Sequence, residues 1–272
     1  MEVKYIDHMG SDLSVVNAAR VSFNKESEWE VRPDDAGDFD FRLSDRDAKL
    51  IQFLARGCTS GDWDALMREV VLLNDTIESI ETLLEILNRV KKMPTHWTPF
   101  GHTAITLHIK APIFVARQLG KHQVGFVWNE VSRRYVDEEP EFYVPEVWRG
   151  RSEDKKQGSY GEVDIESLYY QTDGWTPNLR SQLEILLDEQ VETYKAMVES
   201  GVAPEQARMV LPQSMYTEWY WTGNLYGFVN VFIQRTDSHA QKEVRDVAHQ
   251  IGEIIEPLFP VSWAALTGET ND

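Results

Sequence analysis

Apolar residues recur three or four positions apart along much of this chain, which is the spacing of one face of an α-helix. The segment 75–92 is a clear example, because isoleucines and leucines alternate there with acidic and polar residues at that period. In the last predicted helix, Ser238 and Gln241 form a capping-box pattern that would mark its start. The pattern predicts helices over 12–22, 44–57, 75–92, 178–200, 204–210, 223–235 and 238–256.

Fewer segments show the alternation that is typical of strands. Residues 2–8, 103–109 and 216–222 alternate apolar or aromatic residues with polar ones. Pro112 follows the second of these and suits the first turn of a short helix that would carry Arg117 and Gln118. The balance predicts an α+β fold, helix-rich, with a small and mostly antiparallel sheet.

Two polar segments interrupt this pattern. Residues 24–41 are charged and predict an exposed connection. Residues 142–177 are rich in tryptophan, glycine and charge, and predict an irregular excursion over the surface. Neither is a low-complexity linker, so we expect a single domain over residues 1–272.

The charge balance restricts the partners of the chain. It carries 27 Lys and Arg residues against 45 Asp and Glu residues, a formal net charge of −18. Such a field repels nucleic acid polymers and anionic membranes, so we expect neither as a partner. No apolar run is long enough to span a bilayer, and we see no secretory signal pattern. The single cysteine, Cys58, excludes an intrachain disulfide and a cysteine-based metal cluster, and it favours a cytoplasmic location.

The stretch 117–135 gathers cations in this otherwise acidic chain. Arg117, Lys121, Arg133 and Arg134 accompany a histidine, two glycines and several amide, carboxylate and hydroxyl groups. The apolar run 111–116 leads into the stretch and would anchor it in the core. A solvated charged face would alternate in sign and contain few aromatic residues, so the composition favours a site for an anionic, planar, polar ligand. A basic surface loop beside a core helix is the alternative.

Five blocks of sequence resemble the flavin-dependent thymidylate synthases (ThyX). They occur in the order that this family has, and they span nearly the whole chain. The blocks are residues 17–23, 98–109, 117–135, 207–212 and 221–243. The resemblance implies a homotetramer that holds FAD at subunit junctions and methylates dUMP to dTMP. It also implies 5,10-methylenetetrahydrofolate as the carbon donor and NADPH as the reductant.

The resemblance also assigns roles by position. Contacts with dUMP fall on Gln118, Glu130, Ser132, Arg133, Arg134, Arg208 and Arg235. Contacts with FAD, or places in its pocket, fall on Ser22, His102, Lys121, His122, Gln123, Glu130, Asn224, Asn230 and His239. Arg235 and Ser132 are the catalytic candidates. Ser132 would orient the nucleotide, because no Gly-x-Ser-x-Gly elbow surrounds it.

The chain departs from the family pattern in the basic stretch. The family signature Arg-His-Arg is here Lys121-His122-Gln123, and the distance from it to Ser132 is one residue longer than usual. We therefore expect part of the loop 124–128 to bulge. Lysine keeps a cation but loses the planar fork of arginine, and glutamine removes the charge. Tyr226 stands where the family often has a further arginine.

Two routes could make C5 of a uracil ring nucleophilic. A thiolate could add to C6, but Cys58 has no histidine nearby in the sequence, and we interpret it as an incidental small residue. A guanidinium at the N3/O4 edge could instead stabilise the N3-deprotonated ring without a covalent bond. Arg235 suits that role, because Asn224, Phe228, Phe232 and Arg235 share one face of a helix. A packed core face that ends in a solvated arginine remains the alternative.

Three further positions have a simpler interpretation beside the functional one. His239 would lie in the first turn of the helix 238–256, where free N–H groups favour a flavin oxygen, or it is a surface histidine. Arg208 could reach a phosphate or pair with an acidic neighbour. His239 and Glu243 resemble half of a metal site, but no His-Glu-x-x-His motif accompanies them, so we expect no metal.

Two other functions remain open at this stage. The altered triplet and the longer loop would also suit an enzyme that makes a hydroxymethyl product or another C5-modified pyrimidine nucleotide. A non-catalytic relative that binds nucleotide or flavin would keep the fold and lose turnover.

Overall fold

The computed structural model describes residues 1–33, 38–58, 95–135, 139–151, 158–170, 174 and 176–268. The helix predicted over 75–92 lies outside these residues. Within them the fold is helix-rich α+β, as the sequence predicts. No helix among the described residues is both long and apolar enough to cross a bilayer.

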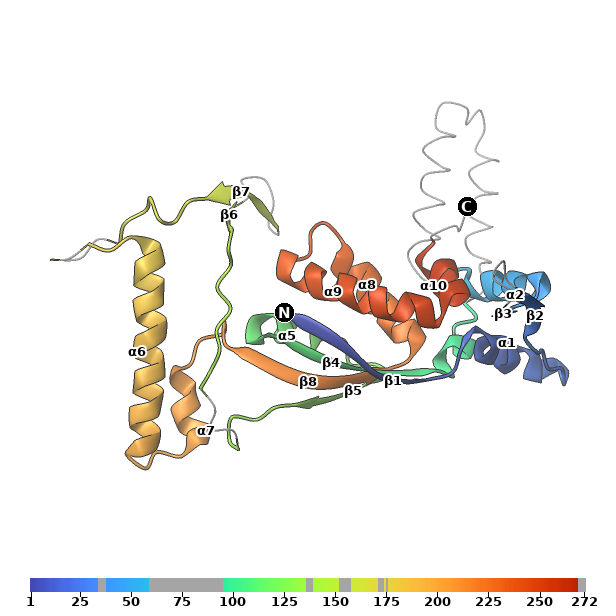
Figure 1. The fold of residues 1–272 in the computed structure, drawn as a ribbon, viewed down its shortest axis with the longest axis horizontal. Helices are drawn as coiled ribbons and strands as arrows, with labels where there is room; N and C mark the ends of the chain where they lie inside the picture. The colour runs from blue at the N-terminus through green and yellow to red at the C-terminus, as the bar shows by residue number, and fades with distance from the viewer. Residues whose placement is uncertain are drawn as a thin grey trace, which may run out of the picture.

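A four-stranded antiparallel sheet forms the centre of the molecule (Figure 1). Its order is β1 (Glu2–Met9), β4 (Ala104–Pro112), β8 (Tyr216–Gly223) and β5 (Phe126–Glu130). The strands predicted over 2–8, 103–109 and 216–222 are confirmed, and the first lies at a sheet edge. β5 is not among the predicted strands, because its alternation is hidden in the cation-rich stretch.

The two faces of the sheet differ. On one face the apolar residues of β4, from Ile105 to Ala111, and the tryptophans of β8, Trp219 and Trp221, are buried. The other face carries polar pairs such as Thr106 with Thr222 and His108 with Glu218. Strand alternation places one set of side chains on each face, so only the first face forms the core.

Helices cover the apolar face, and Figure 1 shows α8 and α9 on that side of the sheet. They are α5 (Ile113–Leu119), α8 (Leu225–Thr236), α9 (Lys242–Ile255) and α10 (Pro260–Thr267). α9 buries Val244, Val247 and Ile251, which are the apolar stripe of the predicted helix. α10 is not among the predicted helices.

Further elements lie at the two ends of the sheet (Figure 1). At one end are α1 (Asp12–Arg20), the 3₁₀ turn η1 (Val21–Phe23), α2 (Asp45–Ala55) and the 3₁₀ turn η2 (Thr98–Gly101). At the other end are α6 (Leu179–Glu199), α7 (Pro204–Ala207) and the 3₁₀ turn η3 (Arg208–Val210). These agree with the helices predicted over 12–22, 44–57, 178–200 and 204–210.

Three predictions about local structure need correction. The connection 24–41 contains a hairpin of β2 (Glu30–Pro33) and β3 (Phe39–Arg42), and the excursion 142–177 contains a hairpin of β6 (Trp148–Arg151) and β7 (Ser159–Val163). The helix predicted from Ser238 begins at Lys242, with Gln241 as its N-cap. The Asp237 side chain accepts a hydrogen bond from the His239 backbone N–H at 2.7 Å, which forms a turn in place of the capping box.

Candidate active site

Two adjacent clefts lie beside α5. The first, about 620 Å³, is lined by residues that include Arg117, Glu130, Arg133 and Arg208; we call it the Arg208 cleft. The second, about 590 Å³, is lined by residues that include Arg117, Lys121, His122, Gln123 and Glu130; we call it the His122 cleft. Ile113, Arg117 and Glu130 line both clefts. Parts of the basic stretch therefore line two cavities, which favours its interpretation as a ligand site over that of a surface loop.

The local sequence explains how this wall forms. Pro112 ends β4 and is the N-cap residue of α5, as its missing N–H and fixed φ favour. α5 ends at Leu119, and Gly125, at φ +80°, turns the chain into β5. β5 then pairs with β8 from Phe126 to Glu130 without a register shift. The extra residue is thus absorbed before Phe126, and the predicted bulge does not extend into 126–128.

Arg235 lies behind the His122 cleft with neutral acceptors. Its Nε donates to His122 Nε2 at 2.9 Å, and its Nη2 donates to the Gln118 carbonyl oxygen at 3.0 Å. Burial lowers the pKa of Arg235, and among the described residues no carboxylate lies within ion-pair distance of it. Burial and the nearby charge of Arg235 lower the pKa of His122 to about 4, so this imidazole is neutral at pH 7. The guanidinium charge is therefore not compensated within the described chain.

Gln118 ties this cluster to the neighbouring helix. Its side-chain Nε2 donates to Gln241 Oε1 at 2.6 Å. Gln241 is the N-cap residue of α9, so α5, α8 and α9 meet at this point. The contact of Gln118 with Gln241 could not be predicted, because a contact across 123 positions leaves no local pattern.

Glu130 is held in place on the rim of both clefts. Its Oε1 accepts from the Thr217 hydroxyl at 2.7 Å, and its Oε2 accepts from Trp128 Nε1 at 3.2 Å. Trp128 in turn stacks on Trp219, with ring centroids 4.4 Å apart and an interplanar angle of 15°. Phe126, Trp128 and Trp221 line the His122 cleft with flat apolar surface. These aromatic residues alternate along β5 and β8, and that alternation is the signal from which this surface could have been predicted.

The residues after β5 are only partly gathered at the clefts. Arg133 lines the Arg208 cleft, whereas neither Ser132 nor Arg134 lines the two clefts. Ser132 Oγ accepts from Arg134 Nε at 3.2 Å, and the Arg134 guanidinium lies 5.1 Å from the ring centroid of Tyr135. This segment is therefore ordered by its own local contacts.

Arg208 lines the cleft without an acidic partner. Its Nε donates to the backbone carbonyl of Glu205 at 3.2 Å, and within the described residues it forms no ion pair. Its interpretation as the partner of an acidic neighbour is not supported, because the contact is with a main-chain oxygen. The residue is exposed and faces the same cavity as Arg117 and Arg133.

Several residues predicted to contact flavin lie elsewhere in the single chain. Ser22 lines a third cleft, whose lining residues are not shared with the other two. His102 is exposed at the Ala104 end of β4, whereas the Arg208 cleft lies at the Pro112 end. The nine residues of β4 separate these ends by roughly 26 Å at strand geometry. One chain therefore does not bring all the predicted flavin contacts into one cavity.

The two asparagines of this set have local roles in α8. Asn224 is the N-cap residue and accepts from the Gly227 N–H at 2.8 Å. Asn230 donates to the Tyr226 carbonyl at 2.8 Å. A β-carbon at Gly125 would stand 3.4 Å from Asn224 Nδ2, so this cap also borders the turn that leads into β5.

His239 is exposed and bound to its neighbour. Its Nδ1 lies 2.9 Å from Asp237 Oδ1, in the turn before α9. The prediction that it lies in the first turn of that helix is wrong. Glu243 accepts from Arg149 Nη2 at 2.6 and 2.8 Å, and the described residues contain no group of three candidate metal ligands.

Tyr226, which stands where the family often has an arginine, contacts Trp97 and the main chain of Cys58. Tyr226 stacks on Trp97 with centroids 5.5 Å apart, and its hydroxyl donates to the Cys58 carbonyl at 2.9 Å. Cys58 itself is buried, with its Sγ 3.2 Å from the Leu54 carbonyl. It lines none of the three clefts, which agrees with its interpretation as an incidental residue.

Comparison with known proteins identifies the family. The family described as thymidylate synthase complementing protein matches residues 4–261. A flavin-dependent thymidylate synthase of Thermus thermophilus is 33% identical over 264 residues, covering 97% of this chain and 74% of its own. One of Kosmotoga olearia is 31% identical over 263 residues, covering 97% and 88%.

A solved structure is also similar over nearly the whole length. It is a UMP/dUMP methylase, PolB, from Streptomyces cacaoi bound with 5-Br dUMP. The TM-score is 0.65 at 26% identity, and the alignment covers 98% of this chain and 94% of that one. Sequence and fold lead to the same conclusion: this chain belongs to the family of flavin-dependent thymidylate synthases.

Proposed function

We propose that the protein methylates dUMP to dTMP, with 5,10-methylenetetrahydrofolate as carbon donor, FAD as cofactor and NADPH as reductant. The observation that carries this proposal is the set of cations that line the two clefts, together with Arg235, which contacts His122 in the wall of the second cleft. Among the described residues, Arg235 has only neutral acceptors, and Arg208 has only a main-chain one. In a chain of net charge −18, cations without carboxylate partners favour an anionic ligand.

The Arg208 cleft and the residues beside it suit a pyrimidine nucleotide. Arg133 and Arg208 would hold the phosphate, and Ser132 and Arg134 would contribute once the segment after β5 closes over the ligand. Gln118 would exchange its contact with Gln241 for the uracil edge. Glu130, fixed by Thr217 and Trp128, accepts from a ring or ribose donor.

Arg235 would then act on the pyrimidine ring. A partly buried guanidinium at the N3/O4 edge stabilises the deprotonated ring, and electron density moves to C5 without a covalent bond to the protein. The neutral His122 assists, because it orients the guanidinium without neutralising it. Cys58 has no part in this scheme.

The His122 cleft has features that a flavin ring system requires. Its wall presents Phe126, Trp128 and Trp221 as flat apolar surface, and Lys121 supplies a cation. The buried Trp221 Nε1 has no hydrogen-bond partner among the described residues. His122 and Gln123 offer further polar groups. When bound, the flavin supplies the hydride.

A homotetramer with sites at subunit junctions would bring the remaining predicted contacts together. Ser22 and His102 lie near the Ala104 end of β4, far from the Arg208 cleft of the same chain. The polar face of the sheet also exposes Val127 and Tyr220, by 65% and 50%. Both features fit a chain whose open surfaces meet copies of itself. The single cysteine fits a cytoplasmic location.

A second candidate is methylation of UMP at the same carbon. The similar solved structure is that of a UMP/dUMP methylase. In this chain Lys121 and Gln123 line the cleft in place of two arginines. These two changes would alter the contacts around the nucleotide. They are also the reason why a hydroxymethyl product stays an alternative.

One experiment tests the proposal and separates the candidates. The purified protein should be yellow, and adding dUMP with methylenetetrahydrofolate to the reduced protein should reoxidise the flavin. Mass analysis of the nucleotide should show dTMP. Formation of a hydroxymethyl nucleotide would contradict the first candidate and support hydroxymethylation. Conversion of UMP in preference to dUMP would support methylation of UMP. Binding of dUMP without reoxidation would indicate a non-catalytic relative.

A further inference from the structure

The third cleft, about 840 Å³, lies between the end of α1 with η1 and the side of α2. Ser22 and Lys25 line one wall, and Arg46 and Lys49 line the other. Leu50 and Leu54 supply apolar surface between them. No role for the α2 wall follows from the function proposed above.

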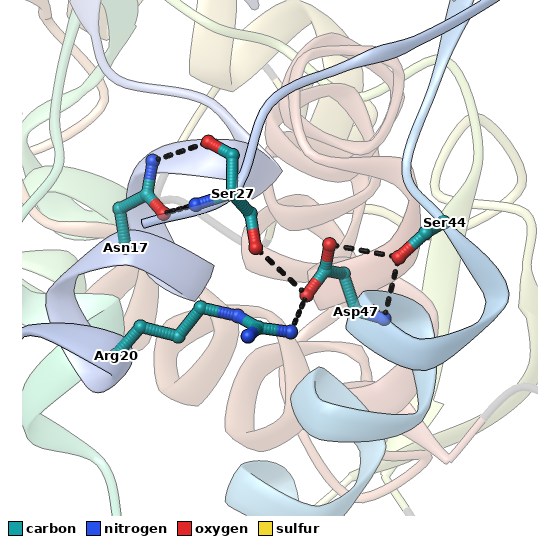
Figure 2. A network of polar contacts seen from close by, with 5 residues as sticks. All are labelled: Asn17, Arg20, Ser27, Ser44 and Asp47. Carbon is teal, nitrogen blue, oxygen red and sulfur yellow. Dashed lines mark hydrogen bonds and ion pairs between the residues drawn. The ribbon is translucent and has the colours of Figure 1, made fainter. Parts of the chain in front are cut away.

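A buried polar network holds the two walls at a fixed distance (Figure 2). Arg20, at the end of α1, forms an ion pair with Asp47 in the first turn of α2, and their side chains are 12% and 5% exposed. The Ser27 hydroxyl donates to the same Asp47 oxygen at 3.1 Å, and Asn17 exchanges two hydrogen bonds with the Ser27 backbone. The segment that carries Ser22 and Lys25 is therefore held against α2 before any ligand arrives.

The network also neutralises the carboxylate of Asp47. Burial raises the pKa of Asp47, but hydrogen bonds from Ser44, Arg20 and Ser27 outweigh it and hold the pKa below the ordinary value. The carboxylate is thus ionised and paired with Arg20. The charge of Asp47 is therefore not available to pair with Lys25, Arg46 or Lys49 on the cleft walls.

Lys25, Arg46 and Lys49 are the free cations of this cleft. Among the described residues none of them forms an ion pair or a hydrogen bond through its side chain, and no described carboxylate lines the cleft. Acidic residues outnumber basic ones in this chain by 45 to 27. Three unpaired cations around one cavity indicate an anionic ligand.

Aromatic surface lies beside these charges. Phe53 stacks on His96 with ring centroids 5.7 Å apart and an interplanar angle of 23°. Phe23, on the opposite wall, is 75% exposed. All three line the cleft, so a planar ring could lie between them while its charged groups reach the cations.

We propose that this cleft binds the p-aminobenzoyl-glutamate tail of the folate co-substrate, whose reacting end lies in the site of a neighbouring subunit. The inference rests on the proposed function, because it takes the folate and the assembly from it. An adenine dinucleotide also combines an aromatic ring with an anionic tail, so the same cleft residues would suit it. Carboxylates spaced along a tail suit single cations on two separate elements. A diphosphate would instead favour the free N–H groups at a helix start, and in α2 Asp45 and Asp47 occupy that first turn.

Direct binding to the assembled, FAD-loaded protein tests this assignment. The probes are p-aminobenzoyl-triglutamate, p-aminobenzoyl-monoglutamate and ADP, each measured by calorimetry. The test variant is Lys25→Ala/Arg46→Ala/Lys49→Ala. The control, Lys4→Ala/Arg180→Ala/Lys195→Ala, removes three cations from other elements, where each forms a surface ion pair. Flavin content and circular dichroism confirm that both variants fold.

We expect the triglutamate probe to bind the unaltered protein more tightly than the monoglutamate. The test variant should weaken the triglutamate about tenfold, with each screened charge contributing a few-fold, and the control should not. The KM for methylenetetrahydrofolate triglutamate should rise by a similar factor while kcat stays constant. Equal binding of the triglutamate to both variants overturns the assignment, and so does a loss confined to ADP. Failure of the proposed function would appear separately, as absence of dTMP with every folate.

Discussion

Two partly buried arginines show how the same side chain takes two roles. Arg20 is paired with the carboxylate of Asp47, which two serines also contact (Figure 2). Within the part of the chain that the structure describes, Arg235 is bound only by the ring of His122 and a main-chain carbonyl. The charge of Arg20 is neutralised by Asp47, and this ion pair joins α1 to α2. The charge of Arg235 is not neutralised by a described carboxylate and is available to a ligand. The type of acceptor therefore distinguishes a structural arginine from a functional one.

Of the substitutions that test this comparison, Arg235→Ala should have the largest effect, and the effect is on turnover. If the unpaired guanidinium acts on the pyrimidine in the transition state, turnover of dUMP should fall about 100- to 1,000-fold. The measurement is kcat at saturating dUMP, with Tm and flavin content as checks that the variant folds. A variant with near-normal turnover would show that another cation does this work.

Arg20→Ala should instead reduce stability. Removing one partner of a buried ion pair leaves the Asp47 charge uncompensated and typically costs about 3 kcal/mol. Denaturant unfolding at one fixed protein concentration measures it, since assembly would otherwise shift the apparent value. The matched control is Arg180→Ala, because the Arg180–Glu184 pair is exposed and should change stability by less than about 1 kcal/mol. Similar losses in both variants would mean that the network does not hold the two helices together.

His122 gives this comparison a pH dependence. Its pKa is about 4 in the folded chain against an ordinary value of 6.5, because of burial and the charge of Arg235. The unfolded chain therefore binds a proton in this window that the folded chain does not. The contribution of His122 to stability is complete above pH 6.5 and decreases as the pH falls towards 4. His122→Gln should flatten the unfolding free energy over this range, and an unchanged slope would assign the dependence to other groups.

The smallest effect is expected at Cys58. Cys58→Ser keeps a hydroxyl within reach of the Leu54 carbonyl, so turnover should stay within about twofold. Steady-state rates with dUMP and methylenetetrahydrofolate measure it. Loss of turnover in a folded variant would support a covalent thiolate route and contradict the role of Arg235.

Much of the fold follows from local patterns in the sequence. The alternation in 103–109 and 216–222 defines β4 and β8, and helical periodicity defines α2, α6 and α8. β5 was missed because its polar residues belong to the site and mask the period. The observed α9 begins later than the pattern predicts, because Asp237 and His239 form a turn through the His239 N–H, and Gln241 is the N-cap residue.

The site was predictable only in part, for a physical reason. The basic stretch and Arg235 are visible as residues, but the contact of Arg235 with His122 joins positions 113 apart. The acceptors that fix Glu130 and Gln118 are equally distant in sequence. Whether a cation is paired depends on such long-range contacts, so the sequence identifies candidates and the fold shows which of them keep their charge.

The most direct test of this account is the ionisation of uracil in the bound nucleotide. The ultraviolet spectrum of dUMP changes when N3 loses its proton, so a titration of the complex against free dUMP reports the ring pKa. We predict that the pKa of the bound ring is lower than that of free dUMP in the unaltered protein and returns towards the free value in Arg235→Ala. An unchanged pKa in the complex, or the same shift in the variant, would contradict the claim that Arg235 activates the ring.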